Sequence, residues 1–166
     1  MSLYTVLPST PRLDELVAAV ILGDQSSLPT KGGAVLNQYA WPREQEVAVK
    51  EEVFRRAREV EAAVSWATVK APKTKLVPVR LISGELTTGP DNLAILLPFQ
   101  PREVLEQAEL QTWRKGTSRW KTKLMPGLIL IHPSVCFIMP DNVPFGPLLC
   151  NILPSDNAKQ PEGSEG

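Results

Sequence analysis

Proline is the residue type that most constrains this sequence, because sixteen of the 166 residues are proline. Proline has no backbone N–H and breaks the interior of a helix, so the chain does not fit an all-helical bundle. Hydrophobic residues make up 43% of the chain and charged residues 22%, which is the balance of an ordinary folded protein and excludes wholesale disorder. The sequence therefore favours short strands separated by many turns.

Three segments nevertheless have helical patterns. Residues 11–22 follow Thr10, which can cap a helix, and they begin with a proline at the position where its missing N–H has no cost. Residues 42–68 place apolar side chains three or four positions apart, which is the spacing of one buried helix face. Residues 101–115 also start at a proline, and Gly116 after them suits a helix C-terminus. We expect a helix in each segment.

Short apolar segments bounded by turn residues predict strands. They are residues 2–7, 76–83, 93–99, 127–132, 135–139 and 148–153. Pro78 lies inside the second segment, so we expect that strand at a sheet edge or at a bulge. Residues 24–34 are polar and contain a pair of glycines, which predicts a loop.

The order of these elements predicts the fold class and the domain organisation. We expect a single α+β domain with a mainly antiparallel or mixed sheet and about three helices. This globular domain is expected to span residues 1–153. Residues 154–166 have almost nothing to bury, so they are expected to form a flexible acidic C-terminal tail.

Charge is balanced over the whole chain but not within it. Lys and Arg number 18, as do Asp and Glu, so the net charge is zero and gives no general attraction to nucleic acid or membrane. Residues 113–123, called the basic strip below, contain five cations, two tryptophans and no acid. Its candidate binding residues are Trp113, Arg114, Lys115, Arg119, Trp120, Lys121 and Lys123.

The basic strip has two interpretations. Its cations can neutralise phosphates and its tryptophan rings can stack on bases, so it is a candidate site for nucleic acid or for an acidic protein partner. The alternative is a solvated helix end and turn, in which both tryptophans are buried in the core and the cations face water.

Catalytic and cofactor motifs are sparse in this sequence. His132 is the only histidine, and Cys136 lies four positions after it, a spacing without mechanistic specificity for a nucleophile and its base. The simpler interpretation places Cys136 and Cys150 in the core as reduced thiols and His132 at a strand end. One histidine and two cysteines are too few for a closed zinc site, and the common phosphate-binding glycine motifs are absent. We expect no cofactor and no metal.

The opening Met-Ser-Leu-Tyr-Thr-Val-Leu-Pro, with Asp14-Glu15-Leu16 and Asn92-Leu-Ala-Ile-Leu96 further along, resembles the small packaging accessory proteins of cystoviruses, the enveloped double-stranded RNA bacteriophages. The resemblance covers about 20 of the 166 residues. It implies a non-enzymatic homodimer inside a viral polymerase complex that aids capsid assembly and RNA packaging. The apolar stretch 124–153 departs from the long polar tail expected of that family.

The C-terminal apolar residues suggest self-association. Leu148, Leu149, Ile152 and Leu153 precede a tail that cannot cover them. A strand so near the terminus often lies at a sheet edge, which invites pairing with another chain. We therefore expect a homodimer or an edge bound by a protein partner.

The sequence also predicts where the protein is located and what kind of function it has. The apolar runs of the C-terminal stretch, such as residues 128–131, are far shorter than the ~20 residues of a membrane-spanning helix, so no membrane span is expected. No secretory signal is visible, which favours an intracellular protein, or a virion protein if the resemblance holds. The first expectation for function is a non-enzymatic interaction or assembly module. The alternatives are a nucleic-acid-binding protein that uses the basic strip, and an enzyme of unrecognised type.

Overall fold

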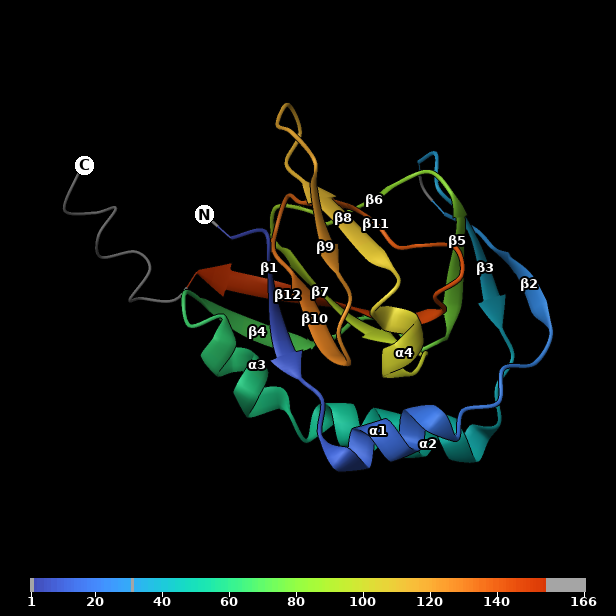
Figure 1. The fold of residues 1–166 in the computed structure, drawn as a ribbon. Helices are drawn as coiled ribbons and strands as arrows, with labels where there is room; N and C mark the ends of the chain where they lie inside the picture. The colour runs from blue at the N-terminus through green and yellow to red at the C-terminus, as the bar shows by residue number, and fades with distance from the viewer. Residues whose placement is uncertain (1, 31, 155–166) are drawn as a thin grey trace, which may run out of the picture.

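Two antiparallel sheets organise this computed structural model, which describes residues 2–30 and 32–154 (Figure 1). The larger sheet has the strand order β1-β10-β7-β12-β5-β3-β2, and β4 pairs with β12 outside this path. Its strands are β1 (Tyr4–Pro8), β2 (Gln25–Leu28), β3 (Val35–Tyr39), β4 (Ala67–Pro72), β5 (Val79–Ser83), β7 (Asn92–Pro98), β10 (Gly127–Ile131) and β12 (Phe145–Pro154). The smaller sheet has the order β6-β11-β8-β9. Its strands are β6 (Leu86–Thr87), β8 (Glu109–Trp113), β9 (Trp120–Lys123) and β11 (Cys136–Ile138).

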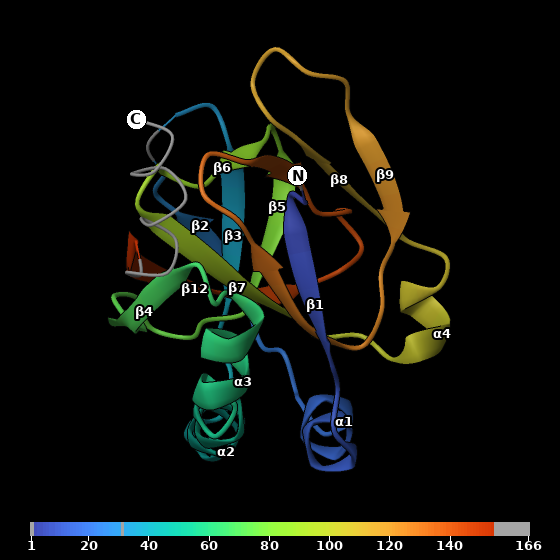
Figure 2. The same cartoon turned by 90° about the vertical axis from the view of Figure 1, so that its left-hand side faces the viewer.

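Helices cover one face of the larger sheet. They are α1 (Pro11–Ala18), α2 (Arg43–Phe54) and α3 (Ala57–Ala63), and Figures 1 and 2 show them along the same side of the molecule. A single helical turn, α4 (Arg102–Leu105), lies between β7 and β8 in the chain. The arrangement confirms the expected fold class, an α+β protein with a mainly antiparallel sheet.

The larger sheet separates two hydrophobic clusters. Leu93, Ile95 and Leu97 of β7 pack in the cluster that contains the helix residues, whereas Ala94 and Leu96 pack in the cluster shared with the smaller sheet. Successive residues of a strand point to opposite faces, so a strand between two clusters is apolar at every position. This explains why β7 and β10 appear in the sequence as continuous apolar runs.

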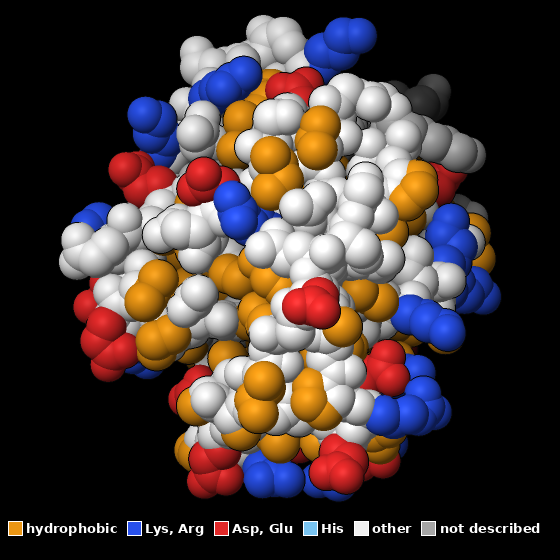
Figure 3. Space-filling view, turned by 90° about the vertical axis from the view of Figure 1, so that its right-hand side faces the viewer, with side chains coloured by type: hydrophobic (Ala, Val, Ile, Leu, Met, Phe, Trp, Pro, Cys, Tyr) orange, Lys and Arg blue, Asp and Glu red, His pale blue; other side chains and the backbone are white. Residues whose placement is uncertain are grey.

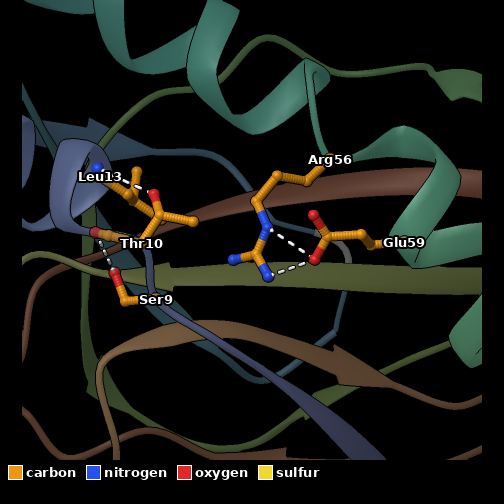
Figure 4. Close-up of polar contacts among 5 residues, drawn as sticks. All are labelled: Ser9, Thr10, Leu13, Arg56 and Glu59. Carbon is orange, nitrogen blue, oxygen red and sulfur yellow. Dashed lines mark hydrogen bonds and ion pairs between the residues drawn. The ribbon is translucent and has the colours of Figure 1, made fainter.

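Helix α1 begins as expected but ends early. The Oγ1 atom of Thr10 accepts a hydrogen bond of 3.1 Å from the Leu13 amide, as Figure 4 shows. The helix ends at Ala18 rather than at residue 22, because Gln45 of α2 binds the chain that follows. Its side-chain amide donates to the Ala19 carbonyl and accepts from the Ile21 amide at 2.7 Å.

The expected helix over residues 42–68 is two helices, and its end is a strand. Arg56 lies between α2 and α3 with a non-helical backbone, and its side chain is buried. Two of its nitrogens donate to Glu59, at 2.6 and 3.2 Å (Figure 4). The buried face therefore carries a guanidinium between Val53 and Val60, where a continuous apolar face was expected. Residues 67 and 68 belong to β4.

The expected helix over residues 101–115 is also wrong. Only α4 is helical, and β8 follows it from Glu109 to Trp113. Gly116 has a φ of 84°, but it lies in the turn between β8 and β9 and does not cap a helix. A glycine with positive φ serves both structures, so this signal did not distinguish them.

The strand predictions hold better, with two corrections. Each of the six predicted segments contains a strand, but residues 24–34, expected as a loop, contain β2. β12 pairs with β7, β4 and β5, so it lies inside the larger sheet and the expected C-terminal edge is wrong. Leu148 and Ile152 are buried in it, while Leu153 is 53% exposed. Pro78 lies just before β5, which is an interior strand whose pairing with β3 contains a register shift at Val35.

The C-terminal boundary stays a prediction. Residues 155–166, which make up nearly all of the expected tail, lie outside the described residues. Within the described chain, no helix is long and apolar enough to cross a membrane.

Candidate binding groove

A groove of about 660 Å³ separates the N-terminal strand from the β8–β9 hairpin. One wall is formed by Ser2, Leu3 and Tyr4, called the N-terminal wall below. Residues of the hairpin and its turn complete the lining: Thr112, Arg114, Thr117, Trp120, Lys121 and Thr122. β1 is the edge of the larger sheet and β9 is the edge of the smaller one, and Figure 2 shows these strands facing each other. The two sheets therefore part at this groove.

The two tryptophans of the basic strip have different surroundings. Trp113 is 7% exposed, and the Arg119 guanidinium lies 4.2 Å from the centre of its ring. Trp120 is 68% exposed and lines the groove. Of the two rings, Trp120 is the one available to a ligand, and Trp113 supports the hairpin from within.

The cations of the strip are also divided. Arg114 donates a hydrogen bond of 2.8 Å to the Pro133 carbonyl, and Arg119 lies 3.9 Å from Glu85. Trp120 pairs across the hairpin with Thr112, and Lys121 pairs with Gln111. Because paired residues share a face of the sheet, the side chains of Trp120 and Lys121 leave the hairpin on opposite faces. The strip is therefore two adjoining surfaces, one on each face of the hairpin.

Lys115, Lys121 and Lys123 are exposed on the turn and on β9. Lys123 lies opposite Glu109 in the register of the hairpin, so its cross-strand neighbour is a carboxylate. Among the residues that line the groove, the charged ones are Arg114 and Lys121. The groove is thus cationic, with an exposed aromatic ring.

A second cleft, of about 530 Å³, has the opposite charge. It lies between α1 and the chain around α4, and its charged lining residues are Asp14, Arg102 and Glu103. Two carboxylates and one guanidinium make this cleft unsuited to a phosphate backbone. The β1–β9 groove is therefore the better candidate for an anionic ligand.

The N-terminal wall is held by His132, the residue that follows β10. Its Nδ1 lies 3.0 Å from the Ser2 carbonyl oxygen, and its Nε2 lies 2.8 Å from Thr5 Oγ1. A carbonyl oxygen only accepts, so Nδ1 carries the proton and Nε2 accepts from the Thr5 hydroxyl. The ring also meets Trp66 edge-on, with 5.5 Å between the ring centres.

Burial lowers the pKa of His132 below its ordinary value of 6.5, the hydrogen bond to the Ser2 carbonyl opposes this shift, and the positive charge of Arg114 adds to it. The neutral imidazole is therefore the form that fits this position. The sequence pattern gave no sign that a histidine would support a binding groove.

His132 and Cys136 have separate partners. The Cys136 thiol lies 3.5 Å from Thr87 Oγ1, and both cysteines are buried, free thiols. Burial raises the pKa of Cys150 to about 11, so its thiolate is disfavoured. This confirms the interpretation of the cysteines as core residues. Within residues 2–30 and 32–154, no group of three or more His, Cys, Asp or Glu side chains could hold a metal ion.

The side of the molecule that carries β2 and β3 differs from the groove. Figure 3 shows it with uncharged surface and hydrophobic patches in the middle and charged side chains mainly towards the margins. Val35 and Ile82, of β3 and β5, are 47% and 38% exposed.

Sequence reasoning identified the hairpin half of the groove and missed the other half. Arg114, Trp120 and Lys121 were predicted as binding residues and do line it, whereas Trp113 is buried. The N-terminal wall is more than one hundred residues away in the chain, and no local pattern connects the two halves. No protein-family model matches this chain, and a search of curated proteins finds no match either.

Proposed function

We propose that this chain is a non-enzymatic binding protein whose β1–β9 groove binds single-stranded RNA or DNA. The exposed ring of Trp120 beside the cations of the groove is the observation that carries the proposal. A base stacked on an aromatic side chain contributes about 1–3 kcal/mol to binding, largely without regard to its identity. Arg114 would then meet a phosphate in the groove, and Lys121, whose side chain leaves the edge strand β9 on the other face, would meet a phosphate that passes that edge. The net charge of zero over the whole chain gives no general attraction to nucleic acid.

A titration with labelled single-stranded oligonucleotides tests this proposal. We expect Trp120→Ala to weaken binding roughly ten- to a hundred-fold, because the stacking contribution is lost. Trp120→Phe, which keeps an aromatic ring, should retain most of the affinity. Equal affinity of the unaltered chain and Trp120→Ala would contradict the proposal.

Salt dependence tests the cations separately. Replacing Lys115, Lys121 and Lys123 by Gln should flatten the plot of log affinity against log salt by ~0.7 for each lost phosphate contact. A matched control replaces three exposed lysines outside the basic strip, Lys70, Lys73 and Lys75, and should leave the slope unchanged. Equal slopes for the two triple variants would assign the binding to some other surface.

A specific observation favours a second candidate, an extended acidic segment of a protein partner. β1 and β9 are both edge strands, and an edge strand offers unpaired backbone groups to an added strand. Competition decides between the two candidates. An acidic peptide that displaces the oligonucleotide completely, and that binds more tightly than any single strand tested, would favour the protein partner.

The assembly and packaging role implied by the resemblance to cystovirus accessory proteins also stays a proposal. Contact with RNA without catalysis, as proposed for the groove, is compatible with such a role. A homodimer is part of the same proposal, although β12, the strand from which it was inferred, is an interior strand.

A further inference from the structure

We propose that His132 is the positioning residue of the groove: its neutral imidazole fastens the N-terminal wall to β10 and keeps the groove in the form that binds its ligand. The inference rests on the proposed function, and it concerns a residue that does not itself line the groove. Three contacts carry it. They are the Nδ1 contact to the Ser2 carbonyl, the Nε2 contact to Thr5 Oγ1, and a backbone hydrogen bond of 3.0 Å from the His132 amide to the Leu3 carbonyl.

The two ring contacts hold the chain at the first residue of the wall and at the residue just after it. Ser2 begins the wall and Thr5 follows it, so Leu3 and Tyr4 are held between two attached points. Within the part of the chain that the structure describes, β1 pairs with β10 alone and forms an edge of the larger sheet. An edge strand is hydrogen-bonded on one side, so it opens more readily than a strand with two neighbours. The imidazole therefore supplies contacts that a second neighbouring strand would supply elsewhere.

His132 itself is firmly placed. The Thr88 hydroxyl donates to the His132 carbonyl at 2.6 Å, and the Trp66 ring packs edge-on against the imidazole. In the described chain, the partners of the ring, Ser2, Thr5 and Trp66, are uncharged, and Arg114 is the charged group whose field acts on it. Arg114 is bound to the carbonyl of Pro133, the next residue, and it also lines the groove. A proton on His132 would therefore introduce a second positive charge beside that of Arg114, behind the wall.

Two substitutions separate the role of the ring contacts from a general role in packing. His132→Leu has a similar size but lacks both polar contacts. His132→Asn can still donate from its side-chain amide towards the Ser2 carbonyl. A matched control, Val49→Ala, leaves a cavity in the helix-side core and lowers the free energy of unfolding without changing a contact of the wall.

Amide hydrogen exchange and oligonucleotide binding are then measured on the full chain. We expect His132→Leu to speed exchange of the β1 amides at least ten-fold relative to the β7 amides and to weaken binding of a short uridine oligonucleotide. His132→Asn should restore most of both properties. Val49→Ala should leave the ratio of β1 to β7 exchange and the affinity unchanged.

The pH profile adds a readout that a purely structural role would not give. In the unaltered chain, the exchange rate of the β1 amides, corrected for its intrinsic pH dependence, should rise as His132 becomes protonated. The midpoint of this rise should equal the midpoint of the His132 titration followed by NMR. In His132→Asn this rise should be absent.

Three outcomes would overturn the proposal: unchanged β1 exchange in His132→Leu, faster β1 exchange with undiminished affinity, or a β1 profile independent of the histidine titration. If the unaltered chain binds no single strand, the proposed function fails, and the exchange and pH measurements still decide whether His132 holds the wall.

Discussion

Strands β9 and β10 follow each other in the chain but have opposite surroundings. All five residues of β10 are buried, between the helix-side cluster and the cluster shared with the smaller sheet. Three of the four residues of β9 are exposed, and Thr122 is half-buried. The comparison shows a division of roles. Strands that are apolar on both faces hold the fold together, and the hairpin with one open edge presents the groove.

The two tryptophans give the largest expected contrast in stability. Trp113→Ala should lower the free energy of unfolding by about 3–5 kcal/mol, because it removes a buried aromatic ring. Trp120→Ala should change it by less than about 0.5 kcal/mol, because this side chain is mostly exposed. Chemical denaturation of both variants measures the difference. Similar losses for the two would mean that Trp120 also belongs to the core.

The same contrast is expected between the strands themselves. Leu130→Ala in β10 removes a fully buried side chain and should lower the free energy of unfolding by about 2–5 kcal/mol. Thr122→Ala in β9 should lower it by less than about 1 kcal/mol, since it loses only partial burial and strand propensity. Urea titrations of the two variants in parallel test this. A larger loss for Thr122→Ala would reverse the assignment of roles.

Acid should weaken the end of β10 through His132. The pKa of His132 is lower in the folded chain than in the unfolded chain. Between these two pKa values the unfolded state therefore binds more protons. The contribution of neutral His132 to the free energy of unfolding is therefore fully present above about pH 6.5, and it decreases as the pH falls towards the lowered pKa of His132 in the folded chain. The difference in unfolding free energy between the unaltered chain and His132→Asn, followed over pH, isolates this effect. A difference that stays constant over pH, or that shifts in favour of the unaltered chain as the pH falls, would contradict it.

The smallest effect is expected at the contact between Arg119 and Trp113. A cation over an exposed part of an aromatic ring contributes about 0.5–1 kcal/mol, and the exposed ion pair with Glu85 adds little. Arg119→Ala should therefore lower the free energy of unfolding by about that amount. A double-mutant cycle with Trp113→Phe checks that the two residues are coupled, and additive losses would show that they are not.

The sequence predicted the fold class and the central strands because both depend on local pattern. β7 and β10 are continuous apolar runs between turn residues, and such runs are typical of strands buried on both faces. The beginning of α1 was also predictable, since Thr10 and the proline after it form a local capping signal.

Other elements depend on tertiary contacts that local pattern does not contain. In β8, Leu110 and Thr112 are buried on one face, while Arg119 covers Trp113 on the other, which hides the alternation of a strand. The break between α2 and α3 depends on the buried contact of Arg56 with Glu59. The interior place of β12 depends on pairing with β7 and β4, which precede it by about fifty residues or more.

The candidate site was predictable only in part, for the same reason. Composition identified the basic strip, but not its division between the two faces of the hairpin. Trp113 and Trp120 look equivalent in the sequence, and cross-strand register determines which of them faces the groove. The N-terminal wall and His132 join the site through long-range contacts, and these became visible only in the structure.

The most direct test of the groove follows the side-chain N–H signals of the four tryptophans by NMR while a single-stranded oligonucleotide is added. We predict that the Trp120 signal shifts most, and that the signals of Trp41 and Trp113, which lie outside the groove lining, shift little. In the same titration, the backbone amide signals of Arg114 and Lys121 should be among those that shift most. Saturable binding that leaves the Trp120 signal in place would contradict the account, because the ligand would then occupy another surface.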